Sequence, residues 1–160
     1  MELKEGQLLF FPKFVFSNGE VSEGKFFLVL KNVAQDVILV SLPSSRKNIP
    51  AKLYNHTGCY YDEASRLSFY AFRRGVAITE CGFTFDKDTL LYGNYLQTYS
   101  KSSIKSKYPT EGEDYQVKGV VCREVMIAIH KLLPRSKKCS ETKISKDAIC
   151  LKYNTNRRLL

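Results

Sequence analysis

The chain has 160 residues, enough for one domain with its own hydrophobic core. Hydrophobic residues make up 44% of it, which excludes a mostly disordered chain. The sequence contains no run of 18 apolar residues, so no membrane span is predicted. The net charge of +9 is uneven: residues 1–97 carry 11 basic and 10 acidic side chains, whereas residues 98–160 carry 14 and 6. We expect the basic C-terminal part to attract a polyanion such as nucleic acid; the alternative is a solvated tail that aids solubility.

The start of the chain and its cysteines indicate the cytoplasm. The opening MELKEGQLLFF lacks the shape of a signal peptide, and the odd number of cysteines without a CxxC motif favours reduced thiols. The cysteines are Cys59, Cys81, Cys122, Cys139 and Cys150.

Neither a metal nor a cofactor is expected. His56 and Cys59 form one loose pair, whereas a structural zinc site needs four ligands. The same two residues are the weak alternative of a thiolate pair for nucleophilic catalysis. No GxGxxG or GxxxxGK[ST] loop occurs, which argues against nucleotide-dependent chemistry.

The first half of the chain predicts three strands. Residues 7–16, 26–30 and 37–42 are dense in aromatic and branched side chains, which is typical of buried strands. Pro12 predicts an edge or a bulge in the first strand. Asn18-Gly19 predicts a turn after it, followed by a polar, flexible connection to Gly24.

Further short strands are expected at 58–61, 67–72 and 89–92, with apolar fragments at 76–78 and 83–85. Many short strands with polar turns predict a small barrel or a sandwich. Residues 101–113 are polar and contain Pro109 and Gly112, so we expect a linker or a mobile loop there.

Apolar residues at spacings of three and four predict a helix over 117–133, capped by Asp114 and stopped by Pro134. A second short helix is expected within 144–151. The expected class is therefore α+β, mainly β. Residues 1–97 would form the β core, and residues 98–160 a linker with a basic helical extension, within a single structural domain.

One group of polar residues stands out in the first third. If the strands at 26–30 and 37–42 pair antiparallel, Lys25 at the start of one meets Ser44, Ser45 and Arg46 at the end of the other. An ammonium, a hydroxyl and a guanidinium can bind a phosphodiester and stabilise the charge that develops when a ribose 2′-OH attacks it. The alternative is an ordinary turn whose charges face water.

The order of these segments resembles the PemK/MazF-type endoribonuclease toxins. The resemblance rests on EGQLLFF, a polar loop ending in EGK, FFLVLKN, VILVSLPSS and a polar stretch with Pro50, and covers residues 6–50. The sequence departs from the family pattern at Glu5-Gly6-Gln7, at Lys25 in place of the catalytic Arg, and at Phe26 in place of Pro.

The resemblance implies a small SH3-like antiparallel β-barrel with helices, usually a homodimer. It implies metal-independent cleavage of single-stranded RNA and inhibition by a cognate antitoxin. Lys25 or Arg46 would stabilise the transition-state charge or protonate the leaving oxygen, and Ser44 or Ser45 would orient the phosphate.

RNA contacts are expected from the loop containing Asn18 and Gly19, from Lys47, and from aromatic residues that stack on unpaired bases. The aromatic candidates are Tyr60, Tyr61, Phe69 and Tyr70. Core packing is the alternative role for these rings, above all for Phe69.

Two other functions stay open. The same barrel could be a non-catalytic nucleic-acid-binding module, which the lysine at position 25 favours because it lacks the planar two-point grip of arginine. It could also be a protein-interaction module that docks through an apolar helix.

Overall fold

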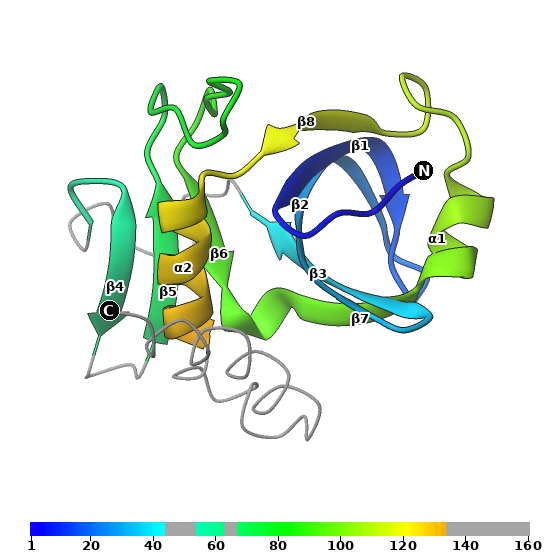
Figure 1. Ribbon diagram of the computed structural model, residues 1–160, viewed down its shortest axis with the longest axis horizontal. Coiled ribbons are helices and arrows are strands. Elements are labelled where there is room, and N and C mark those ends of the chain that lie inside the picture. Colours follow the sequence, from blue (N-terminus) through cyan, green and yellow to red (C-terminus); the bar gives the residue numbers. More distant parts are fainter. Residues whose placement is uncertain (44–53, 63–66, 134–160) are drawn as a thin grey trace, which may run out of the picture.

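The computed structural model describes residues 1–43, 54–62 and 67–133. The fold is mainly β, as predicted, with two antiparallel sheets and two α-helices in the described part of the chain (Figure 1). None of the helices in that part is long and apolar enough to cross a membrane.

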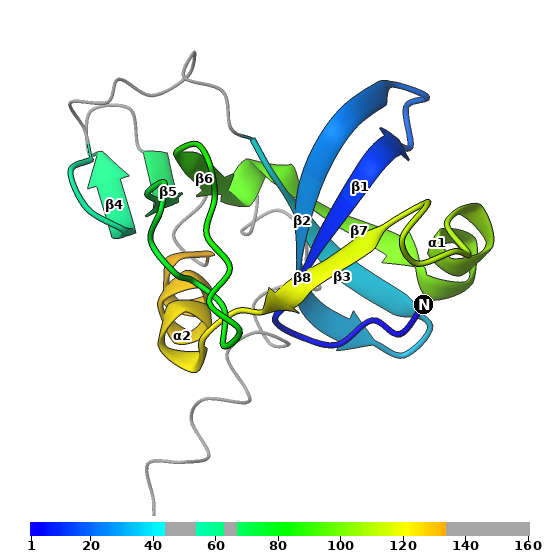
Figure 2. The ribbon, with the colours of Figure 1, turned by 90° about the horizontal axis from the view of Figure 1, so that it is seen from above.

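The larger sheet has five strands in the order β7-β3-β2-β1-β8. Their bounds are β1 Gln7–Val15, β2 Val21–Val33, β3 Asp36–Leu42, β7 Leu96–Ser100 and β8 Gln116–Val120. β2 and β3 pair antiparallel, which confirms that prediction. The sheet is strongly curved (Figure 2), but its edge strands β7 and β8 do not pair within the described residues, so no closed barrel forms there.

The smaller sheet has the order β4-β5-β6 and is inserted in the sequence between β3 and β7. Its strands are β4 Gly58–Asp62, β5 Leu67–Phe72 and β6 Thr89–Tyr92, close to the predicted ranges. A 3₁₀ turn at Gly93–Tyr95 then leads into β7.

Both faces of the central strands are buried, because each sheet separates two hydrophobic clusters. In β2, Leu28 and Leu30 face the core between the two sheets, whereas Phe27 and Val29 face a second core on the other side. In β5, Tyr70 joins the core between the sheets and Phe69 joins a third cluster behind it. This double burial explains why the strands are unbroken apolar runs instead of alternating ones.

The turn predicted at Asn18-Gly19 is confirmed, but the flexible connection to Gly24 is wrong. Phe16 N–H donates to Glu20 C=O at 2.8 Å, and Gly19 has φ +84°, a conformation that glycine adopts without strain. β2 begins at once at Val21, which pairs with Val15 of β1. Lys25 therefore lies inside a strand and not at its start.

The predicted linker at 101–113 begins with a helix instead, α1 Lys101–Lys107. The Ser100 side chain caps its first turn by accepting from Ser103 N–H at 3.5 Å. Ile104 and Tyr108, four residues apart, are both buried in the second core. The prediction failed because this helix is mostly polar and packs on the protein through only two apolar residues, Ile104 and Tyr108.

The predicted helix at 117–133 is wrong in its first part, because Gln116–Val120 is strand β8, paired with β1. Helix α2 spans Arg123–Leu132. Asp114 caps no helix; its side chain accepts from Thr110 N–H at 2.9 Å within a turn. The helix expected within 144–151 lies outside the described residues.

Candidate functional site

Lys25 is the one predicted catalytic residue that the structure describes; Ser44, Ser45 and Arg46, with Lys47, lie outside it. It stands opposite Phe11 of β1 and is half-buried. The last β2–β3 pair is Phe26 with Leu42, so Lys25 lies one residue beyond it, level with Pro43. From Val21 to Lys25, β2 pairs with β1 alone among the described residues.

Burial lowers the pKa of the Lys25 ammonium below its ordinary value of 10.5, and the negative charge of Glu20 opposes part of this shift. No ion pair links Lys25 to a residue of the described ranges. A desolvated ammonium is a stronger acid than an exposed one, and its field on a nearby phosphate is less screened.

The predicted RNA-contacting residues are spread over the molecule. Asn18 and Gly19 are exposed in the β1–β2 turn, where the Asn18 side chain accepts from Glu20 N–H at 3.0 Å. Tyr61 of β4 is 51% exposed and can meet a ligand. Tyr60 has a structural role: its hydroxyl donates to His56 C=O at 2.9 Å and its ring stacks on Phe69.

The idea that Phe69 and Tyr70 stack on bases is wrong, since the two side chains are 1% and 4% exposed. Their burial follows from the central place of β5 in its sheet. No group of three metal-binding side chains that includes His56, Cys59 or Cys81 occurs in the described part of the chain.

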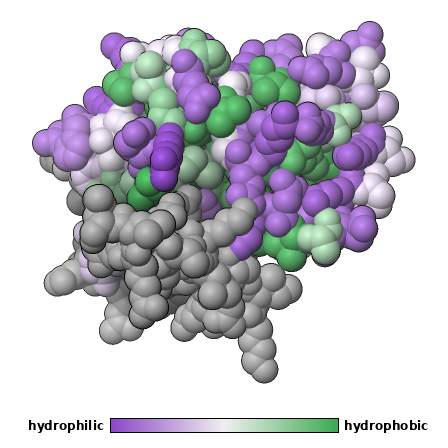
Figure 3. Space-filling view, in the orientation of Figure 1, coloured by the Kyte–Doolittle hydropathy of each residue, from purple (hydrophilic) through white to green (hydrophobic). Residues whose placement is uncertain are grey.

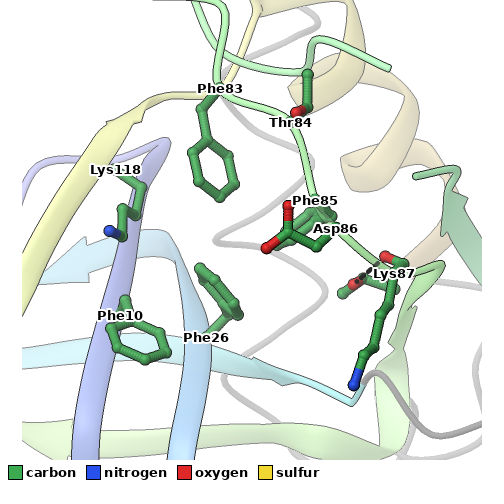
Figure 4. Close-up of a pocket in the computed structure, with 9 residues that line it drawn as sticks. Phe10, Phe26, Phe83, Thr84, Phe85, Asp86, Lys87 and Lys118 are labelled. Carbon is green, nitrogen blue, oxygen red and sulfur yellow. Dashed lines mark hydrogen bonds between the residues drawn. The ribbon is translucent and has the colours of Figure 1, made fainter. Parts of the chain in front are cut away.

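An open cavity lined by aromatic side chains lies on the face of β2 opposite to Lys25 (Figure 4). We call this cavity the phenylalanine pocket. Its volume is about 370 Å³. Phe10 of β1 and Phe26 of β2 form one side, and the connection between β5 and β6 supplies Phe83 and Phe85. Polar residues complete the lining: Thr84, Asp86, Lys87, Thr89 and Lys118.

Strand register and turn hydrogen bonds position these rings. Phe10 and Phe26 are cross-strand partners with centroids 4.9 Å apart. The 78–83 turn is closed by Ile78 N–H donating to Phe83 C=O at 3.0 Å, and the Thr79 hydroxyl accepts from Phe83 N–H at 2.8 Å. The pocket thus joins the large sheet to the β5–β6 connection.

The charged groups of the pocket make no ion pairs within the described residues. Lys118 Nζ lies 5.5 Å from the centroid of Phe10, in cation–π contact, and donates to Gln116 Oε1 at 2.6 Å. Figure 4 shows the Asp86 carboxylate turned toward the space between Phe26 and Phe83. The pocket therefore combines aromatic surface, two ammonium groups and one carboxylate.

Sequence reasoning missed this pocket. The run Phe83-Thr84-Phe85-Asp86-Lys87 alternates aromatic and polar residues, the pattern of a segment with one face against the protein and one toward solvent. That pattern was the available signal. It could not show which face of the large sheet the segment would cover.

Figure 3 shows hydrophobic residues reaching the surface in patches between hydrophilic ones on the face drawn in Figure 1. The large hydrophobic side chains most exposed among the described residues are Val21, Tyr61, Val76 and Tyr95. They come from four different segments, so they do not define one site by themselves.

The chain matches no protein-family model and shows no match among curated proteins. The residues and their geometry therefore carry the functional argument.

Proposed function

We propose that this chain is a metal-independent endoribonuclease of the toxin–antitoxin type that cleaves single-stranded RNA. The observation that carries the proposal is Lys25, a half-buried ammonium without an ion pair to any described residue, level with the end of β3. Ser44, Ser45 and Arg46 follow the end of β3 in the sequence after Pro43.

In the proposed reaction, the ribose 2′-oxygen attacks the adjacent phosphorus and the bond to the 5′-oxygen breaks. The 2′-OH proton passes to water, and the Lys25 ammonium gives a proton to the leaving 5′-oxygen. A lowered pKa makes this transfer easier at neutral pH. Arg46 and the hydroxyl of Ser44 or Ser45 hold the phosphate oxygens. The products are a 2′,3′-cyclic phosphate and a 5′-hydroxyl.

The edge of β2 beyond its pairing with β3 supports a path for the substrate. Side chains of neighbouring strand residues point to opposite faces, so Lys25 and Phe26 lie on the two sides of β2. Over Val21–Lys25, β2 pairs with β1 alone within the described ranges, and in this proposal the RNA strand passes along this edge from the phenylalanine pocket to Lys25.

We also propose that the curved five-stranded sheet corresponds to the SH3-like barrel of the PemK/MazF-type toxins. The antiparallel order β7-β3-β2-β1-β8 and the curvature in Figure 2 support this assignment. A cytoplasmic location, a homodimer and inhibition by an antitoxin protein belong to the same proposal.

The test is incubation of the purified protein with mixed-sequence single-stranded RNA in EDTA. Wild type is expected to leave cyclic-phosphate ends, and Lys25→Ala to lower the rate by about 10²–10⁴-fold, the usual contribution of general acid catalysis. Arg46→Ala is the second test variant. Lys31→Ala is the matched control, because Lys31 is a partly buried lysine of the same strand. Cleavage by Lys25→Ala at the wild-type rate contradicts the proposal.

A second candidate is a non-catalytic nucleic-acid-binding module, favoured by the aromatic and cationic lining of the phenylalanine pocket. It predicts salt-dependent binding of RNA without cleavage of any substrate tried. If neither binding nor cleavage is found, the protein-interaction module is the remaining reading.

A further inference from the structure

The phenylalanine pocket offers stacking surface for one flat ring. Phe85 is 2% exposed and forms the floor, while Phe10, Phe26 and Phe83 are only partly buried. Phe26 and Phe83 each meet Phe85 edge-on, at interplanar angles of 89° and 86°. Phe26 also packs on Phe10, with centroids 4.9 Å apart, and on Phe83, with centroids 5.9 Å apart and an interplanar angle of 49°. A flat base can therefore stack on Phe83 but not on Phe26 and Phe83 together. The volume of about 370 Å³ lies at the low end for small-molecule pockets and suits a single base.

Two ammonium groups on the rim suit phosphate. Lys118 reaches over Phe10 from β8, and Lys87 stands on the β5–β6 connection. Neither makes an ion pair with a described residue. A nucleotide whose base lies against the rings can therefore place a phosphate beside one of these lysines. Binding the phosphate there breaks no ion pair between the lysine and a described residue.

Asp86 sets the orientation and the choice of base. It is exposed, makes no ion pair within the described residues, and its carboxylate turns toward the aromatic space (Figure 4). A carboxylate repels phosphate, so the base edge must lie at Asp86. An ionised carboxylate accepts two hydrogen bonds side by side. Guanine offers two neighbouring donors, N1–H and N2–H, on its Watson–Crick edge.

The other bases fit this carboxylate less well. Adenine and cytosine each place an acceptor nitrogen beside their amino donor. Uracil has one donor flanked by two carbonyl oxygens, which the carboxylate repels. Each of these bases therefore forms at most one of the two hydrogen bonds that guanine forms with the carboxylate.

We infer that the phenylalanine pocket binds one unpaired nucleobase of RNA and selects guanine, through stacking on Phe83 and two hydrogen bonds to Asp86. This inference rests on the proposed function in so far as single-stranded RNA is the ligand. It adds a recognition site on the opposite face of β2 from Lys25.

The probe is a fluorescein-labelled hepta-uridine with 2′-fluoro sugars, which lack the nucleophile for cleavage, carrying U, G, A or C at the centre. Binding is measured by fluorescence anisotropy at one salt concentration. Wild type is expected to bind the G probe about ten-fold more tightly than the U probe, since one well-made pair of hydrogen bonds discriminates by about 1–3 kcal/mol. Asp86→Asn is expected to bring all four probes within about two-fold of each other.

Phe83→Leu keeps an apolar side chain but removes the ring, and is expected to weaken binding of the G probe about ten-fold, within the usual range for base–aromatic stacking. Asp36→Asn is the charge-matched control, an exposed aspartate at the start of β3. Phe16→Leu is the aromatic control, a partly buried ring outside the pocket. Circular dichroism verifies that each variant is folded, and the controls are expected to bind as wild type does.

Equal binding of the four probes by wild type, no binding of any probe, or a guanine preference that survives Asp86→Asn would each overturn the inference. Cleavage of unmodified RNA is scored separately. If guanine preference is present but Lys25-dependent cleavage is absent, the ribonuclease proposal fails and the base pocket stands. If cleavage depends on Lys25 while the probes bind equally, the base pocket alone fails.

Discussion

Replacing Gly119 with alanine is expected to destabilise the protein by about 2–5 kcal/mol, because of backbone strain and a close approach. Gly119 in β8 has φ +129°, a conformation that costs a residue with a Cβ about 1–3 kcal/mol. The added Cβ would lie 2.6 Å from Cys81 Sγ and 3.1 Å from Thr79 Cβ. Carbon contacts prefer about 3.5–4.0 Å, so the turn against β8 must move.

The turn at residues 78–83 also positions a ring of the phenylalanine pocket. Glu80 N–H donates to Val120 C=O at 2.9 Å, and Cys81 Sγ donates to Lys118 C=O at 3.4 Å. The Thr79 hydroxyl in turn accepts from Phe83 N–H. Pushing the turn off β8 therefore displaces Phe83, so Gly119→Ala is expected to weaken RNA binding even where the protein stays folded.

Urea unfolding measures the effect. With a slope of about 2 kcal/mol per molar, the midpoint is expected to fall by about 1–2.5 M. Gly112→Ala is the matched control, because Gly112 has φ +94° and no atom within 4 Å of an added Cβ. Cys81→Ala combined with Gly119→Ala removes the nearest atom and is expected to recover part of the loss. Equal midpoints for Gly119→Ala and Gly112→Ala would refute the role of the close approach.

Four further outcomes are expected. Lys25→Met lowers the cleavage rate as much as Lys25→Ala does, yet raises the free energy of unfolding slightly, by less than about 1 kcal/mol after solvent screening, because a partly desolvated charge is removed. Burial raises the pKa of both Tyr70 and Tyr99 to about 12, so the folded state keeps protons that the unfolded state loses near pH 10. Urea midpoints should therefore fall from about pH 10 to 12, and less steeply in Tyr70→Phe. Burial lowers the pKa of His130 below 6.5, so midpoints should fall as pH drops below that value, because the unfolded state binds the proton first. Phe11→Ala, at a side chain with no exposure, should cost about 3–5 kcal/mol in the same assay, whereas an unchanged midpoint would contradict its place in the core.

The strands that the sequence predicted well are those whose signal is local. Phe26–Leu30 and Val37–Leu42 are buried on both faces, and that burial is visible as unbroken apolar runs. Asn18-Gly19 predicts its turn through backbone preference alone.

The errors come from partners distant in sequence. Val117, Val121 and Val125 have helical spacing, but Val117 pairs with Leu9 of β1, and no local pattern encodes that partner. The same holds for the site. Lys25 was found from its own neighbourhood, whereas Phe10 and Phe83 line one pocket only because the β5–β6 connection folds over β1 and β2.

The position of β1 between β2 and β8 has a consequence for the newly made chain. β1, β2 and β3 are joined by short turns and can form as soon as they leave the ribosome, whereas β8 follows only after the smaller sheet and α1. Until then Gln7–Phe10 presents an apolar edge that can pair with another chain. Pro12 and Lys13 lie beyond the stretch that β8 covers and interrupt that edge. A chain ending before Gln116 should therefore aggregate during synthesis, whereas in a chain that reaches Val120 strand β8 covers the edge of β1.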